Sequence, residues 1–196
     1  MTFRIEEKLF IKSDSIVDFK EFINTKFTKK NFNPRIIESV YFENSKLEMY
    51  RDSIEGLTPR KKIRIRHYPT QKDAKFYLET KVSSVEGRFK KRKLIDIQKF
   101  ENLKKIGIFD LQYGVCHPNL TIRYMREYFQ IDDIRITIDN NITYKFYLNE
   151  FIYKDLDTIV EIKTSIKKNL DDLLKSFPFQ KIRLSKYCNG IVKFRN

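Results

Sequence analysis

The sequence is poor in the residues that crosslink a chain or make it flexible. Of its 196 residues, five are glycine, five are proline and two are cysteine. Two isolated cysteines, Cys116 and Cys188, give neither a disulfide framework nor the spacing of a zinc site, so we expect a reduced, cytoplasmic protein. The scarcity of glycine and proline excludes long flexible linkers and favours a fold rich in strands.

Long apolar runs are also missing. No stretch approaches the roughly 18 uncharged apolar residues that a membrane span needs. Charged residues within 1–12 exclude the apolar centre of a signal peptide. We therefore expect a chain without a membrane segment. A glycine-rich phosphate loop is absent too, so any nucleotide must be held by side chains.

Positive charge, in contrast, is in excess. Forty Lys and Arg against 26 Asp and Glu give a formal net charge of +14. Such a surplus indicates an anionic partner, which could be nucleic acid, an acidic membrane, a nucleotide or another polyphosphate. The hydrophobic content of 41% is typical of a globular protein. We expect residues 1–196 to form a single domain.

Alternating apolar and polar residues predict many strands with a few helices between them. The expected strands lie near 3–12, 36–43, 46–52, 61–69, 75–83, 87–96, 119–129, 133–145, 158–164 and 182–187. Helices are predicted after Ser13 or Asp14, from Asp96 to Gly107, and from Ser165 or Asn169 to Pro178. This order indicates an α+β fold with a closed or strongly curved antiparallel sheet.

Five of these strands carry charged residues at positions i and i+2, which places the charges on one face. In residues 61–68, Arg64 and Arg66 share one face while Ile63 and Ile65 share the other. The basic residues predicted for the charged face are Lys8, Arg64, Arg66, Lys81, Arg126, Arg135, Lys163 and Lys186. The carboxylates predicted for it are Glu6, Glu79, Asp139 and Glu161.

Two interpretations of this charged face remain open. It could be a solvated, salt-bridged face of an ordinary sheet. It could instead line a cavity that binds phosphate, because Arg binds phosphate oxygens bidentately and Lys acts as a point charge. The carboxylates could then hold a divalent metal ion. The number of strands with paired charges favours the cavity.

Two further segments carry candidate residues. The basic run 89–93, which includes Lys91, could be a solvated strand or loop, or could draw polyanions into the cavity. Ser185 lies next to Lys186, but no helix-borne motif or oxyanion loop supports a nucleophile pair there.

Eight short motifs follow one another along the chain. They are Arg4-Ile5-Glu6-Glu7-Lys8, Ser39-Val40-Tyr41-Phe42, residues 60–68, Leu78-Glu79-Thr80-Lys81, Tyr124-Met125-Arg126, residues 135–139, Val160-Glu161-Ile162-Lys163 and Ser185-Lys186-Tyr187. In this order they resemble the VTC domain, the polyphosphate polymerase domain of the triphosphate tunnel metalloenzyme superfamily. Each motif is weak alone, and together they extend over nearly the whole chain.

The resemblance implies a closed, eight-stranded antiparallel tunnel with helices outside it. It implies a phosphotransferase that moves the terminal phosphoryl of ATP onto polyphosphate with Mn²⁺ or Mg²⁺. Glu161 would be the main metal ligand and Glu6 a second one. The residues that would bind phosphate are Lys8, Arg64, Arg66, Lys81, Lys91, Arg126, Arg135, Lys163, Ser185 and Lys186.

One motif departs from the hydrolytic branch of this superfamily, which opens with Glu-x-Glu-x-Lys. Here Arg4 replaces the first glutamate, and only Glu6 and Lys8 match. The loss of one carboxylate favours phosphoryl transfer over hydrolysis. The alternatives are an inorganic or nucleoside triphosphatase, a non-catalytic polyphosphate-binding module and a nucleic-acid binder. The last is disfavoured because the carboxylates of the charged face would repel a nucleic-acid backbone.

Overall fold

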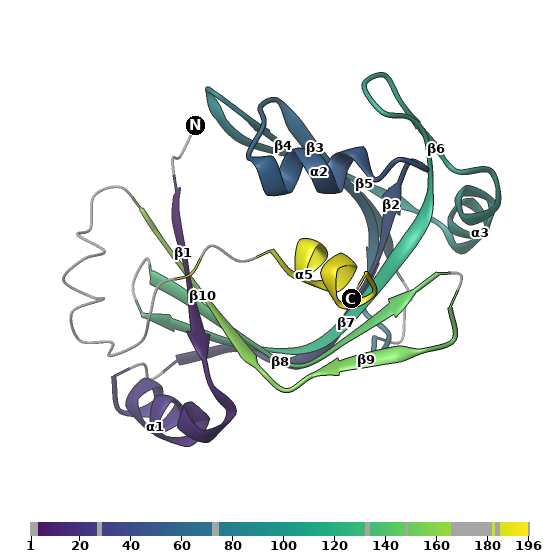
Figure 1. Cartoon of the computed structure of the whole chain (residues 1–196). Coiled ribbons are helices and arrows are strands. Elements are labelled where there is room, and N and C mark those ends of the chain that lie inside the picture. The colour runs from purple at the N-terminus through teal and green to yellow at the C-terminus, as the bar shows by residue number, and fades with distance from the viewer. Residues whose placement is uncertain are drawn as a thin grey trace. The chain divides into compact units, whose positions relative to one another are not determined.

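The structure of the chain is a computed structural model (Figure 1). Its residues group into two compact units. It describes residues 4–26, 29–71, 75–131, 134–147, 149–165, 182 and 185–195. Unit 1 comprises the described residues within 1–35, 124–142 and 155–184, and unit 2 those within 36–123, 143–154 and 185–196. Three long strands, β2 (Lys29–Glu43), β7 (Gly114–Ile131) and β8 (Ile134–Phe146), contribute residues to both units.

Unit 1 pairs β1 (Arg4–Ile11) with β10 (Thr158–Ser165), and β10 with β8, all antiparallel. The short 3₁₀ helix η1 (Ser13–Ser15) leads into α1 (Ile16–Lys26), and Phe19 of α1 is fully buried. The core of this unit consists of Leu9, Ile11, Phe19, Phe129, Ile134, Ile136, Ile138, Val160 and Ile162. These strand residues alternate with charged neighbours, so the opposite face of the same strands carries the charges.

Unit 2 is built on β3 (Arg60–His67), β4 (Phe76–Ser84) and β5 (Gly87–Ile95), which pair antiparallel with one another, and β3 pairs with β2. The shorter strands β6 (Ile108–Asp110) and β9 (Ile152–Asp155) pair with β7 and β8. Its helices are α2 (Glu48–Glu55), α3 (Ile97–Ile106) and α5 (Lys186–Lys193). The core cluster contains Val40, Phe42, Met49, Ile63, Ile65, Phe76, Phe100, Leu103, Tyr113 and Cys116.

The helix predicted between Asp96 and Gly107 is confirmed as α3. The Asp96 side chain accepts a hydrogen bond from the Lys99 N–H at 2.6 Å, which caps the first turn. Gly107 ends the helix at φ 84°, a conformation that glycine adopts without strain. A Cβ at this position would lie 2.9 Å from the Cys116 carbonyl oxygen, so the turn also needs the absence of a side chain.

The strand order is β1-β10-β8-β7-β2-β3-β4-β5. The expected α+β class with an antiparallel sheet is therefore confirmed. Among the described residues, no strand pairing joins β5 back to β1, so closure of the sheet stays a prediction. None of the helices in the described ranges is long and apolar enough to cross a membrane.

The strand expected over 46–52 is wrong, because this segment is largely helical. The segment 46–52 lies mostly in α2, which begins where the Asn44 side chain accepts the Glu48 N–H at 3.0 Å and ends at Gly56 with φ 78°. The strand expected over 182–187 is contradicted only at Lys186 and Tyr187, which belong to α5. The Ile182 N–H donates to the Lys8 carbonyl oxygen at 2.9 Å, and residues 183 and 184 lie outside the described residues. The Ser185 side chain accepts the Cys188 N–H at 3.3 Å and caps α5. The helix expected from 165 or 169 to 178 lies outside the described residues.

Helix α5 packs closely within unit 2 and lies beside α2 (Figure 1). A Cβ on Gly190 would come within 2.6 Å of Leu120 and Tyr144, so a glycine is needed for this approach. The buried Glu43 carboxylate accepts hydrogen bonds from the Tyr187 hydroxyl and, at 2.7 Å, from the Tyr50 N–H. Burial raises the pKa of Glu43 above its usual value despite these hydrogen bonds.

Candidate active site

Unit 2 places two arginines on the charged face of β3, in what we call the arginine cluster: Ser39, Tyr41, Arg64, Arg66, Glu79, Lys90 and Arg92. The register sets Arg64 between Tyr41 of β2 and Glu79 of β4. Arg64 donates from Nε and Nη2 to Glu79 Oε2 at 2.8 and 2.6 Å, and from Nη1 to the Tyr41 hydroxyl at 2.7 Å. Arg66 donates from Nε to Ser39 Oγ at 3.1 Å.

Positive charge dominates the arginine cluster. Glu79 is 1% exposed, and the Lys90 ammonium and Arg92 guanidinium lie 2.5 and 3.4 Å from its Oε1. Burial acts to raise the pKa of Glu79, but the charges of Arg64 and Arg66 outweigh it and lower the pKa to about 2. Burial also acts to raise the pKa of Tyr41, but the charges of the same two arginines outweigh it, and the pKa is lowered below its usual value. One carboxylate thus faces four cationic groups, an excess suited to binding an anion.

The depressed pKa of Glu79 predicts a loss of stability in acid. The stability that this carboxylate contributes is complete above about pH 4.5 and is lost as the pH falls through about 2. Urea denaturation between these pH values should show a loss of about 3 kcal/mol from this group. Glu79→Gln should flatten the pH dependence, while the exposed control Glu101→Gln should keep that of the wild type. Identical slopes for wild type and Glu79→Gln would contradict the assignment.

Unit 1 holds a second group of charges, the carboxylate cluster: Glu6, Lys8, Arg126, Asp139, Glu161 and Lys163. Asp139 is fully buried, and its two oxygens accept hydrogen bonds from Arg126 Nε at 2.5 Å and Nη2 at 2.6 Å. Arg126 Nη2 also lies 3.7 Å from Glu161 Oε2. The Lys163 ammonium lies 2.8 Å from Glu161 Oε1 and 3.2 Å from Glu6 Oε2.

Glu161 stays ionised in spite of its burial. Desolvation raises the pKa of Glu161, but a hydrogen bond with Glu6 and the charges of Lys163 and Arg126 hold it well below its usual range. Desolvation lowers the pKa of Arg126, whereas Tyr124, Asp139 and Glu161 raise it well above the ordinary value. Glu161 therefore remains a carboxylate, the form in which it can bind a cation.

The carboxylates of Glu6 and Glu161 supply part of the oxygen ligands that a small divalent metal ion needs. Within the described ranges, no group of three or more His, Cys, Asp or Glu is placed to hold a metal. The two carboxylates nevertheless converge on one cation, the Lys163 ammonium. Mg²⁺ is commonly bound by one or two carboxylates together with water and substrate phosphates. This pair suits that mode of binding, in which phosphate oxygens complete the coordination.

Most of the predicted residues fall into these two clusters. Arg64 and Arg66 are joined by Lys81, which lies on the same face opposite Lys62 but is exposed. Arg135 lies opposite Lys163 in unit 1. Lys91 does not join the arginine cluster, because its register partner is Thr80 and it points to the other face. Its neighbours Lys90 and Arg92 approach Glu79 instead.

Lys186 and Ser185 also differ from expectation, since neither lies on a strand. Ser185 caps α5, and its Oγ accepts a hydrogen bond from Lys62 Nζ at 2.9 Å. Sequence reasoning missed Lys62, Lys90 and Arg92, although the i, i+2 spacing of Lys62 with Arg64 and of Lys90 with Arg92 was a usable signal. It also missed the contacts of Tyr41, which depend on the neighbouring strand.

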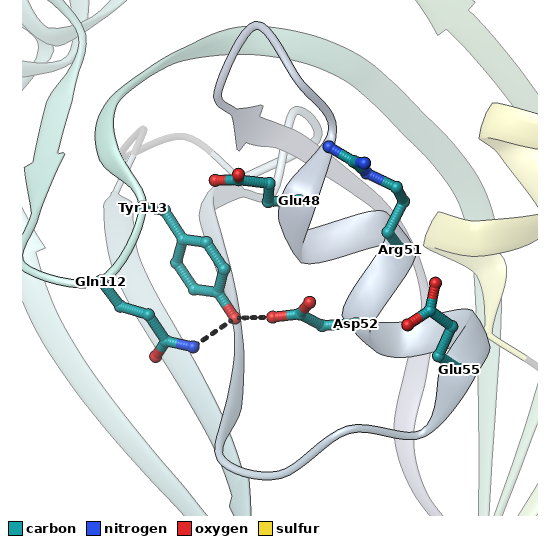
Figure 2. Close-up of a pocket in the computed structure, with 6 residues that line it drawn as sticks. All are labelled: Glu48, Arg51, Asp52, Glu55, Gln112 and Tyr113. Carbon is teal, nitrogen blue, oxygen red and sulfur yellow. Dashed lines mark hydrogen bonds between the residues drawn. The ribbon is translucent and has the colours of Figure 1, made fainter.

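A separate surface pocket of about 330 Å³ lies between α2 and the turn before Tyr113 (Figure 2). It is lined by Glu48, Arg51, Asp52, Glu55, Gln112 and Tyr113. The Tyr113 hydroxyl donates to Asp52 at 2.7 Å and accepts from Gln112 Nε2 at 3.0 Å. Three carboxylates and one guanidinium do not suit a phosphate ligand, so each of the two charged clusters is a better candidate for a phosphate site than this pocket.

The antiparallel fold of this chain is shared by solved structures and is matched by a family model. The family model described as the VTC domain matches residues 3–195, and the chain belongs to that family. The predicted resemblance is thereby confirmed. None of the curated proteins matches the sequence.

Solved structures share the fold at low sequence identity. A candidate adenylate cyclase from Bacillus halodurans has a TM-score of 0.65 and 15% identity, covering 100% of this chain and 98% of its own. A candidate adenylyl cyclase from Hippeastrum with a dominant triphosphatase activity has a TM-score of 0.60 and 16% identity, covering 97% and 96%. A chain of the Schizosaccharomyces pombe Mediator head module has a TM-score of 0.57 and 11% identity, covering 92% and 99%.

Proposed function

We propose that this chain is a polyphosphate polymerase-like phosphotransferase that moves the terminal phosphoryl of ATP onto a polyphosphate chain. The observation that carries the proposal is the arginine cluster, in which buried Arg64 and Arg66 exceed the charge of the single carboxylate Glu79. An excess of positive charge on neighbouring strands suits the binding of a densely charged anion. The family likeness supports polyphosphate as the substrate class, and we propose that residues 1–196 form one domain with a closed tunnel.

Phosphoryl transfer depends on positioning and on neutralising charge. An oxygen of the terminal phosphate of polyphosphate forms a bond to the γ-phosphorus of ATP, the bond to the β,γ-bridging oxygen breaks, and ADP leaves. The residues proposed to bind these phosphates are Lys8, Arg64, Arg66, Lys81, Arg126, Arg135, Lys163 and Lys186, with Ser185 as a weaker candidate. Lys91 points to the other face of β5 and does not belong to this set. Their fixed positive charges would offset charge as it shifts to the leaving group.

Glu161, together with Glu6, is proposed to hold Mn²⁺ or Mg²⁺. When bound there, the ion would neutralise charge on phosphate oxygens. Asp139 serves a different purpose, because both of its oxygens are engaged by Arg126. It orients the guanidinium, and Arg126 remains within reach of Glu161.

The purified protein with ATP and Mn²⁺ should form long polyphosphate, and it should release one ADP for each phosphoryl group that it adds to the chain. We expect Glu161→Gln to abolish most of this product, because the metal loses its main ligand. Glu55→Gln, which removes an exposed carboxylate from the pocket of α2, serves as the matched control and should retain full activity. Gel analysis of polyphosphate length and an ADP assay measure the two products. The absence of polyphosphate with the wild-type protein would refute polymerase activity.

The second candidate function is that of a triphosphatase, which is favoured by the activity of the Hippeastrum structure. Release of orthophosphate without chain growth would support it. The likeness to a chain of the Mediator head module shows that the fold is also found in a large assembly. A fold does not fix a function, so polyphosphate binding without any turnover would support a binding module instead.

A further inference from the structure

Strands β1 and β10 place four charges in an alternating square. Glu6 lies directly opposite Lys163, and Lys8 lies directly opposite Glu161. Side chains that face each other across antiparallel strands are close enough to interact, as are residues two apart on one strand face. Each carboxylate therefore has a lysine both across from it and beside it.

Lys163 has a special place in this square because its ammonium lies between both carboxylates. It is 2.8 Å from Glu161 Oε1 and 3.2 Å from Glu6 Oε2, whereas Lys8 lies 3.8 Å from Glu6 Oε1. Two carboxylates in contact repel each other unless a cation or a proton lies between them. The Lys163 ammonium supplies that cation from the protein itself.

We propose that Lys163 is an internal counter-cation of the Glu6–Glu161 pair, and that a divalent metal ion must displace it in order to bind. The inference rests on the proposed metal and phosphate binding at this cluster. An ammonium and a divalent ion cannot both occupy the space between the carboxylates, because their charges repel at such short distances. The displaced ammonium then needs another anion, and a phosphate oxygen of the substrate provides it.

This exchange makes metal and oxyanion binding cooperative. Without an oxyanion, the displaced ammonium gains no new anionic partner, while Arg126 and Lys8 already add positive charge to the same cluster. With an oxyanion present, the freed ammonium gains a partner, and the metal gains oxygen ligands. Coupling of this kind is reciprocal and commonly amounts to about 5–150-fold in affinity.

The test is a titration of the full chain with Mn²⁺, followed by the electron paramagnetic resonance of the free ion. Sodium sulfate serves as a weakly chelating oxyanion probe, with sodium chloride at equal ionic strength as its reference. We expect sulfate to tighten Mn²⁺ binding to the wild type at least about fivefold. Lys163→Met should bind Mn²⁺ alone at least about fivefold more tightly than the wild type, and sulfate should then have little effect.

Three further variants keep the result interpretable. Lys163→Arg retains the cation and should behave like the wild type. Lys20→Met removes a lysine of the same unit that pairs with Glu127 at 3.0 Å, away from the cluster, and should change nothing. Glu161→Gln should lose Mn²⁺ binding.

The outcomes separate the two proposals. Equal or weaker Mn²⁺ binding by Lys163→Met, with binding still lost in Glu161→Gln, would overturn the role of Lys163 and leave the metal site intact. Mn²⁺ binding that survives Glu161→Gln, or its absence from every variant, would overturn both the metal site and the exchange.

Discussion

Replacing Arg126 with methionine is expected to lower the free energy of unfolding by about 3–5 kcal/mol. The reason is the fully buried Asp139, whose two oxygens accept hydrogen bonds from the Arg126 guanidinium. Without that guanidinium, the buried carboxylate loses the cation that binds both of its oxygens, and more of the cost of its desolvation is exposed. Urea denaturation at neutral pH measures the loss.

A double variant separates this cause from a simple loss of packing. Arg126→Met with Asp139→Asn removes the stranded charge, so it should regain a substantial part of the lost stability. Arg123→Met, three residues earlier on β7, is the matched control because its guanidinium lies 3.4 Å from Glu38 and is largely exposed. It should change stability by no more than about 1 kcal/mol. If the Arg126→Met variant alone is as stable as the wild type, then the buried Asp139 carboxylate does not destabilise it, and the explanation is wrong.

Arg66→Ala should have the largest effect on catalysis. We expect the rate of polyphosphate formation from ATP to fall by about 10²–10³-fold, the usual cost of removing one fixed donor to a charged transition state. Its hydrogen bond to Ser39 Oγ joins it to a neutral group, so stability should suffer less than in Arg126→Met.

The control for Arg66→Ala is Arg88→Ala on β5, where the side chain is exposed. It removes the same charge from the same unit and should leave the rate near that of the wild type. Initial rates at saturating Mn²⁺ are the measurement, and an undiminished rate for Arg66→Ala would exclude this arginine from the proposed reaction.

Alternation along a single strand was enough to predict the two faces of β3. Arg64 and Arg66 meet Tyr41, Glu79 and Ser39, whereas Ile63 and Ile65 join the apolar core. The side-chain period of two is a local property, so it can be read without knowledge of the partner strands. The same reasoning placed Glu161 and Lys163 on one face of β10, and the structure confirms that they lie in contact.

Properties that depend on distant residues could not be predicted in the same way. Neighbouring side chains of a strand point to opposite faces, so an error of one residue selects the wrong face. From the sequence we predicted Lys91 in the run 89–93, whereas Lys90 and Arg92 lie on the face of the arginine cluster. The sequence predicted a short strand near 182–187, but Lys186 and Tyr187 are the first residues of α5. The Ser185 cap and the close packing of Gly190 against Leu120 and Tyr144 stabilise this helix.

The contacts of α5 also determine when the arginine cluster can mature during biosynthesis. Tyr187 stacks on Tyr41 at 4.9 Å between ring centroids, and its hydroxyl bonds to Glu43, 144 residues earlier. Ser185 meets Lys62 across 123 residues. Chains fold from the N-terminus as they are synthesised, so β2 and β3 leave the ribosome long before these partners exist. Tyr41, and with it the surroundings of Arg64, acquires its final environment only after the last helix has been translated.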